Sequence, residues 1–166
     1  MARLIKRSLI PALGLLVMAA LVVGIRGLTA QEGLSLEGVR VTALASPDGG
    51  DTLFAGTNQQ GLFFSSNGGR SWSARSSGLN AMRDLVRFYV TDIVFVHTDP
   101  YKIFLGTNQG HVHRSTDAGA SWELTAHIRT SGGIWDLEVD AFDGATVYAA
   151  TDDGLFKSTD DGASWD

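Results

Sequence analysis

The sequence predicts an all-β chain of three similar four-stranded units, the third incomplete, after an apolar amino-terminal segment. An eight-residue motif occurs three times, at residues 65–72, 115–122 and 158–165. Short apolar runs separated by turn residues precede each copy, which is the pattern of β-hairpins. The glycines at one motif position lie 50 and 43 residues apart. A period of about 40 to 50 residues with four strands per unit is typical of a β-propeller blade.

The repeated motif predicts a tight connection between two strands. Its shared positions are a serine, an Asp or Asn two residues later, a glycine two further on and a tryptophan three beyond that. The Asp or Asn can accept hydrogen bonds from nearby backbone N–H groups, and the glycine can adopt a positive φ. The tryptophan supplies an apolar anchor whose indole N–H needs a partner. We therefore assign a structural role to twelve residues: Ser65, Asn67, Gly69, Trp72, Ser115, Asp117, Gly119, Trp122, Ser158, Asp160, Gly162 and Trp165.

The motif resembles the Asp-box, also called the bacterial neuraminidase repeat. Similar boxes occur in sialidases, xyloglucan-cleaving endoglucanases, sortilin-type receptors and photosystem II assembly factors. The resemblance covers residues 39–166 and implies a β-propeller in which the box joins the third and fourth strands of a blade. Because these proteins include enzymes, receptors and assembly factors, the resemblance predicts the fold and not the function.

The first 26 residues predict an export signal. Three basic residues precede an apolar run from Leu9 to Ile25, and Arg26 follows it. The run of 17 residues is at the lower limit for spanning a bilayer. Leu28 and Ala30 form a poor cleavage site, so we favour an uncleaved signal anchor over a cleaved signal peptide, and both over a buried core helix. The basic end then stays in the cytoplasm, and the remainder is exported to the periplasm or the extracellular space.

Charge and composition exclude some partners and chemistries. Residues 27–166 contain 9 basic and 18 acidic residues, a formal charge of −9, with no basic cluster. This acidity argues against nucleic acid as a partner. The chain has no cysteine, so disulfides and thiolate chemistry are excluded. We expect no cofactor and no metal site.

The predicted elements follow a linker at residues 27–38. The three units span residues 39–78, 90–127 and 134–166, and a short helix is predicted over 81–87 between the first two. The strands are predicted at 39–46, 52–57, 62–66 and 71–75; at 90–96, 102–107, 111–116 and 121–126; and at 134–141, 146–151 and 155–159.

Three blades are fewer than the four to eight that usually close a propeller. Because repeated units bury their faces only against neighbours, an isolated set of three leaves apolar surface exposed. The sequence is therefore interpreted either as part of a longer propeller or as one of several chains that complete a ring.

Two aspartates are weak catalytic candidates. Asp92 and Asp136 occupy equivalent places in the first strands of their units, and in a propeller these strands line the central channel. A carboxylate pair there could act as in glycoside hydrolysis, but binding of backbone N–H groups is the favoured interpretation. His111 and His113 share a strand face, and we interpret them as packing residues because a metal site needs a third ligand.

The function predicted from these features is that of an exported, membrane-tethered propeller that acts as a binding or assembly scaffold for a protein or glycan. The membrane contact would be made by residues 9–25. The alternative is the amino-terminal part of an exported glycoside hydrolase, either polysaccharide-cleaving or sialidase-like. Sialidase activity is disfavoured because none of the arginines occupies the arginine motif expected ahead of the first blade.

Overall fold

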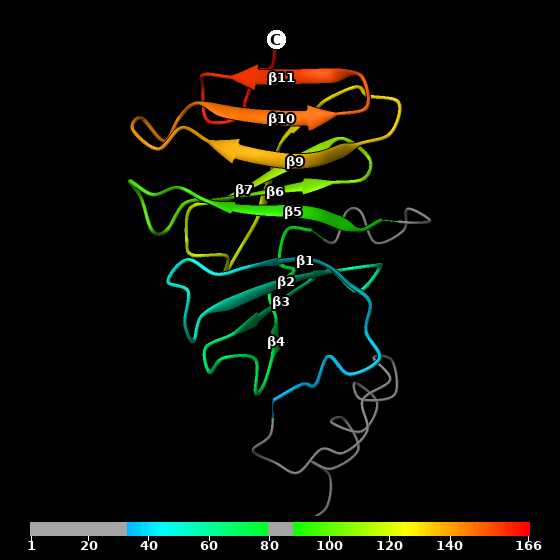
Figure 1. Ribbon diagram of the computed structural model, residues 1–166, viewed down its shortest axis with the longest axis vertical. Coiled ribbons are helices and arrows are strands. Elements are labelled where there is room, and N and C mark those ends of the chain that lie inside the picture. Colours follow the sequence, from blue (N-terminus) through cyan, green and yellow to red (C-terminus); the bar gives the residue numbers. More distant parts are fainter. Residues whose placement is uncertain (1–32, 80–87) are drawn as a thin grey trace, which may run out of the picture. The chain divides into compact units, whose positions relative to one another are not determined.

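The computed structural model describes residues 33–79 and 88–166, which form three antiparallel sheets (Figure 1). The predicted signal segment and the predicted helix at 81–87 lie outside the described residues. Within the described residues, no helix is long and apolar enough to cross a membrane. The all-β prediction is confirmed, and each sheet follows the preceding one in chain order.

Sheets 1 and 2 each contain four strands in sequential order, joined by antiparallel pairing. Sheet 1 consists of β1 (Val41–Ala45), β2 (Leu53–Thr57), β3 (Leu62–Ser65) and β4 (Ser73–Ala74). Sheet 2 consists of β5 (Val90–Phe95), β6 (Ile103–Thr107), β7 (His111–Ser115) and β8 (Glu123–His127). The strands lie within about two residues of their predicted bounds, except that β4 is shorter because Trp72 pairs with Leu34 instead.

Sheet 3 contains three strands, as the sequence predicts. They are β9 (Ile134–Val139), β10 (Val147–Thr151) and β11 (Gly154–Ser158). The backbone of Asp166 exchanges two hydrogen bonds of 2.9 Å with Lys157, at the place where β4 and β8 pair in the other sheets.

The three sheets share one register, so their residues can be compared position by position. The first strand of each sheet carries an irregularity near its start, at Thr42, Thr91 and Trp135. Beyond it, Asp92 pairs with Gly106 and Asp136 pairs with Ala150, which confirms that these positions are equivalent.

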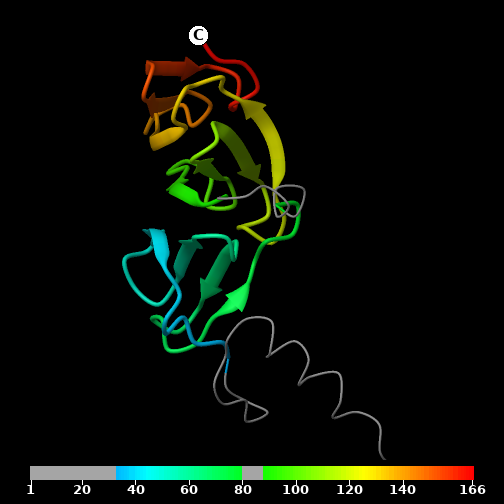
Figure 2. The same ribbon diagram turned by 90° about the vertical axis from the view of Figure 1, so that its right-hand side faces the viewer.

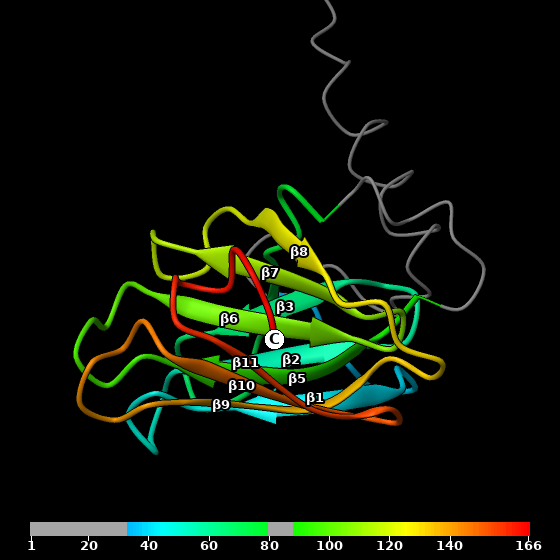
Figure 3. The ribbon, with the colours of Figure 1, turned by 90° about the horizontal axis from the view of Figure 1, so that it is seen from above.

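The first strands also lie next to one another. β1 contacts β5, and β5 contacts β9, so the three first strands occupy the same edge of their sheets (Figure 3). Figure 2 shows the sheets from the side, each facing the next.

Two apolar cores lie between the sheets and hold them together. The core between sheets 1 and 2, here called junction 1, contains Phe54, Leu62, Leu79, Val90, Ile93, Ile103, Leu105 and Trp122. The core between sheets 2 and 3, here called junction 2, contains Val96, Phe104, Val112, Ile128, Ile134, Leu137, Val139, Val147 and Ala149. Sheet 2 is therefore buried on both faces, which explains why β6 is apolar along its length and buried at every residue.

Candidate functional site

The box turns are held by a short network that starts at their serine. In the second box, the Ser115 hydroxyl accepts hydrogen bonds from the N–H of Gly119 at 2.8 Å and of Asp117 at 3.3 Å. The same hydroxyl donates to the Asp117 carboxylate at 2.8 Å. The carboxylate in turn accepts the N–H of Ser121 at 2.8 Å and its hydroxyl at 2.5 Å. The third box repeats the network with Ser158 and Asp160 in these roles.

The first box uses an amide where the others use a carboxylate. The Asn67 side-chain oxygen accepts hydrogen bonds from the Ser65 hydroxyl and the Ser71 N–H, both at 2.9 Å. Its amide nitrogen donates to the Ser71 hydroxyl at 2.8 Å, so this hydroxyl accepts where Ser121 donates. A neutral side chain therefore supports the same turn.

The hydrogen bonds of the box also stabilise the ionised form of its aspartates. The hydroxyl and then the N–H of Ser121 lower the pKa of Asp117 to about 2. Ser164 likewise lowers the pKa of Asp160 to about 2. A carboxylate with so low a pKa is a poor proton donor near neutral pH, which argues against general acid chemistry at the boxes.

The box tryptophans of sheets 2 and 3 differ in their surroundings. Trp122 is 5% exposed, and its indole N–H donates to the carbonyl of Arg75 in the preceding unit at 3.0 Å. The indole N–H of Trp165 instead donates to Gly162 within its own box. Trp165 lines a hollow together with Ala126, His127, Ile128, Arg129, Phe156, Ala163 and Ser164.

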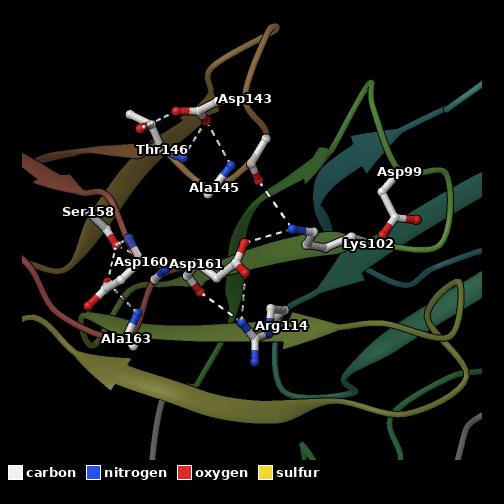
Figure 4. Close-up of polar contacts among 12 residues, drawn as sticks. Asp99, Lys102, Arg114, Asp143, Ala145, Thr146, Ser158, Asp160, Asp161 and Ala163 are labelled. Carbon is white, nitrogen blue, oxygen red and sulfur yellow. Dashed lines mark hydrogen bonds and ion pairs between the residues drawn. The ribbon is translucent and has the colours of Figure 1, made fainter.

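An ionic cluster connects the third box to sheet 2 (Figure 4). The Lys102 ammonium lies 2.7 Å from the Asp161 carboxylate. The Arg114 guanidinium donates to the Asp161 carbonyl at 3.3 Å and also pairs with Glu123 at 2.7 Å. The sequence did not predict these contacts, which join residues 59 and 47 positions apart.

The two candidate catalytic aspartates have different environments. The Asp92 carboxylate accepts the Leu137 N–H at 2.8 Å, so it ties sheet 2 to sheet 3. Burial raises the pKa of Asp92, and the negative charges of Asp136 and Glu138 add to this effect, while the Leu137 N–H opposes it. Asp136 is exposed on the side of sheet 3 that faces away from sheet 2.

The histidines form a row across β7 and β8. The rings of His111 and His127 stack with centroids 4.4 Å apart. His113 is 1% exposed, and neither ring nitrogen has a hydrogen-bond partner among the described residues. Burial lowers the pKa of His113 to about 4 and keeps the ring neutral. Among the described residues, no group of three His, Asp or Glu side chains is arranged to hold a metal ion.

One exposed aromatic residue did not emerge from the sequence. Trp135 is 60% exposed, and its indole N–H donates to Asp152 at 2.9 Å. Asp153, the next residue, accepts the N–H and the hydroxyl of Ser131. These bonds hold the loop before β9 against the turn between β10 and β11.

The comparisons with known proteins identify the fold. No family model matches the sequence, and no curated protein matches it. An ancestral GH74 enzyme is similar over 76% of this chain and 18% of its own, with 23% identity and a TM-score of 0.60. The GH74 enzyme of Niastella koreensis is similar over 77% and 17%, with 24% identity and a TM-score of 0.59. YCF48 bound to a D1 peptide is similar over 76% and 40%, with 16% identity and a TM-score of 0.61.

These similarities confirm that the three sheets are blades of a β-propeller. The chain spans less than a fifth of the two GH74 enzymes and 40% of the YCF48 chain. At these identities the likeness establishes the shared fold alone, so activity and partners have to be argued from this chain's own residues.

Proposed function

We propose that this chain forms blades of an exported, membrane-tethered β-propeller that acts as a binding scaffold for a protein partner. The observation that carries the proposal is the use of the acidic side chains. Asp117 and Asp160 hold box turns, and Asp92 holds the next sheet, so these carboxylates serve the architecture. The structure of YCF48 with a D1 peptide supports a protein ligand because it pairs this fold with a bound peptide.

A capture experiment tests the scaffold role and separates protein from glycan partners. The full chain, immobilised in detergent, is incubated with solubilised membranes of its source that have been treated with protease, with glycosidases or with neither. Retention that is lost after protease and kept after glycosidase treatment is the expected result. The reverse pattern would contradict a protein partner.

Export and tethering have their own test. Alkaline phosphatase fused after Asp166 is active only on the oxidising side of the membrane, so we expect high activity from the fusion. Resistance of the chain to carbonate extraction is expected for an anchor, whereas release would mean that the signal is cleaved.

A glycoside hydrolase is the second candidate, and one observation favours it. Asp92 has a raised pKa and lies close enough to Asp136 for their charges to interact, as expected for an acid paired with a second carboxylate. Asp92→Asn and Asp136→Asn, made in the full protein, test this pair on xyloglucan and on sialosides. Turnover that these changes do not alter would eliminate both residues as catalytic groups.

A further inference from the structure

The two outer sheets each present one face that no described residue of a neighbouring sheet covers. Each sheet has a front face, turned towards the next sheet in the chain, and a back face, turned towards the preceding one. The front face of sheet 3 and the back face of sheet 1 are the two without a neighbouring sheet. Their residues can be compared with equivalent residues inside the two junctions.

The front face of sheet 3 carries apolar residues at the positions that fill the junctions. Phe104 and Val112 of sheet 2 are fully buried against sheet 3. The shared register makes Tyr148 and Leu155 their equivalents. Leu155 is 70% exposed, so a residue suited to a junction lies open on this face.

The back face of sheet 1 shows the complementary exposure. Val90 and Ile93 are buried in junction 1, where they are 0% and 5% exposed. Their equivalents in sheet 1 are Val41 and Leu44, which are 41% and 65% exposed. The two open faces are therefore the two halves of the contact that this chain already makes twice.

Polar groups on the two faces also match. Asp92 accepts the N–H of Leu137, so its equivalent Asp136 is placed to accept the N–H of Leu44, which is equivalent to Leu137. Thr42 donates to the Val90 carbonyl at 2.6 Å across junction 1. Trp135 holds the Thr42 position in sheet 3 and would cover Val41, the equivalent of Val90.

Charge provides a further match. Arg114 bonds Asp161 in the third box, and Lys157 is the equivalent of Arg114. In the first box Gly68 replaces Asp161, but the Asp51 carboxylate lies 3.4 Å from where a side chain on Gly68 would begin. Asp51 therefore provides the negative charge that Lys157 would meet.

We infer that the front face of sheet 3 binds the back face of sheet 1 of a second copy of this chain, and that two copies close a ring of six blades. Each copy contributes one of each face, so both contacts between the copies are the same. Six blades fall within the usual range for propellers. The inference rests on the blade geometry, and it is independent of what the completed ring binds.

Sedimentation velocity of the full chain in detergent tests this assembly. We expect twice the protein mass of one chain, and Leu155→Asp or Leu44→Asp should each weaken the dimer at least tenfold, because each places a charge in both contacts. Leu124→Asp is the matched control, since Leu124 is 51% exposed on β8, away from both faces. Circular dichroism should show that all three variants remain folded.

Mixing the two variants makes the test specific for head-to-tail contact. A Leu155→Asp copy and a Leu44→Asp copy can share one contact without either charge, so the mixture should dimerise more strongly than either variant alone. Lys157→Asp and Asp51→Lys should each weaken the dimer, and the double variant should restore it.

Three outcomes would overturn the inference. A wild-type chain that remains monomeric at high concentration would mean that another segment or partner covers these faces. Assemblies larger than two copies would exclude the six-blade ring. A Leu44→Asp variant with unchanged affinity would exclude sheet 1 as the opposing face.

Discussion

Junctions 1 and 2 join equivalent strands in the same register, yet they use different side chains. Junction 1 is rich in aromatic contacts, with Phe54 packed edge-on against Phe64 and Phe95 at centroid distances of 5.1 and 5.6 Å. In junction 2, Arg114 takes the place of Phe64 and binds the third box. The comparison shows that the backbone repeat fixes where the sheets meet, while the chemistry of the contact can vary.

The box tryptophans show the same contrast. In junction 1 the loop after β4 closes on Trp122, whose N–H groups donate to Arg75 and Ser77. Gly78 is required there because its φ is +86° and a side chain would collide with the Trp122 carbonyl. In junction 2 the corresponding loop leaves a hollow beside Trp165. Junction 1 should therefore depend on its tryptophan more than junction 2 does.

The largest predicted effect is the loss of Trp122. Trp122→Ala should lower the free energy of unfolding by about 3–5 kcal/mol, because it empties a buried site and leaves the Arg75 carbonyl without its donor. Trp165→Ala is the matched control and should cost about 1–2 kcal/mol, since Trp165 is only partly buried. Urea unfolding of the full chain followed by circular dichroism measures both. Equal losses would remove the distinction between the junctions.

The next effect should come from His113 in junction 1. The equivalent residue in junction 2 is Phe156, so His113→Phe transfers an apolar ring into a site where the imidazole has no hydrogen-bond partner. We expect the free energy of unfolding to rise by about 1–3 kcal/mol at pH 7.

The same variant should change the dependence of stability on pH. The pKa of His113 is lowered to about 4 in the folded chain from an ordinary value of 6.5. The unfolded chain therefore binds a proton first, and the wild type should lose stability as the pH falls from about 7 to about 4. His113→Phe should remove this part of the loss. A pH profile of unfolding that is the same in both proteins would contradict a buried neutral histidine.

A smaller effect is expected from the ion pair of junction 2. Lys102→Met keeps the apolar stem and removes the charge that pairs with Asp161, so it should cost about 1 kcal/mol. Thr52→Val is the control in junction 1, because Thr52 holds the Lys102 position in sheet 1. The cost of Lys102→Met should shrink in 1 M salt. A cost that is independent of salt would mean that packing, and not charge, accounts for it.

Much of the fold could be predicted because the box marks its own place in each repeat. Once Ser65, Ser115 and Ser158 are aligned, the strands on either side follow from the alternation of apolar runs and turns. The alignment also predicted that Asp92 and Asp136 are equivalent, since both follow the same irregularity in their first strands.

Contacts between blades could not be predicted in the same way. Aligned repeats show which residues are equivalent, but not which residue of the next repeat lies opposite. The partners of Trp122 and Asp92 are Arg75 and Leu137, 47 and 45 positions away, and both bonds involve a backbone group that carries no sequence signal. The Lys102–Asp161 pair was missed for the same reason.

The smallest predicted effect concerns the residue before each box glycine. Gly68, Ala118 and Asp161 all have positive φ, between 55° and 67°. A residue with a Cβ pays about 1 kcal/mol for this conformation, so Ala118→Gly should stabilise the chain by about 0.5–1 kcal/mol, and Gly68→Ala should destabilise it by a similar amount.

Asp161→Gly relieves the same backbone strain but removes the contacts of the Asp161 carboxylate with Lys102 and Arg114. We therefore expect a net loss of stability in junction 2 where the equivalent change gains stability in junction 1. Thermal unfolding of the three variants decides this, because opposite signs for Ala118→Gly and Asp161→Gly require that the Asp161 side chain holds sheet 3 to sheet 2. If both variants gained stability, the ionic cluster would contribute less than the strain it imposes on the turn.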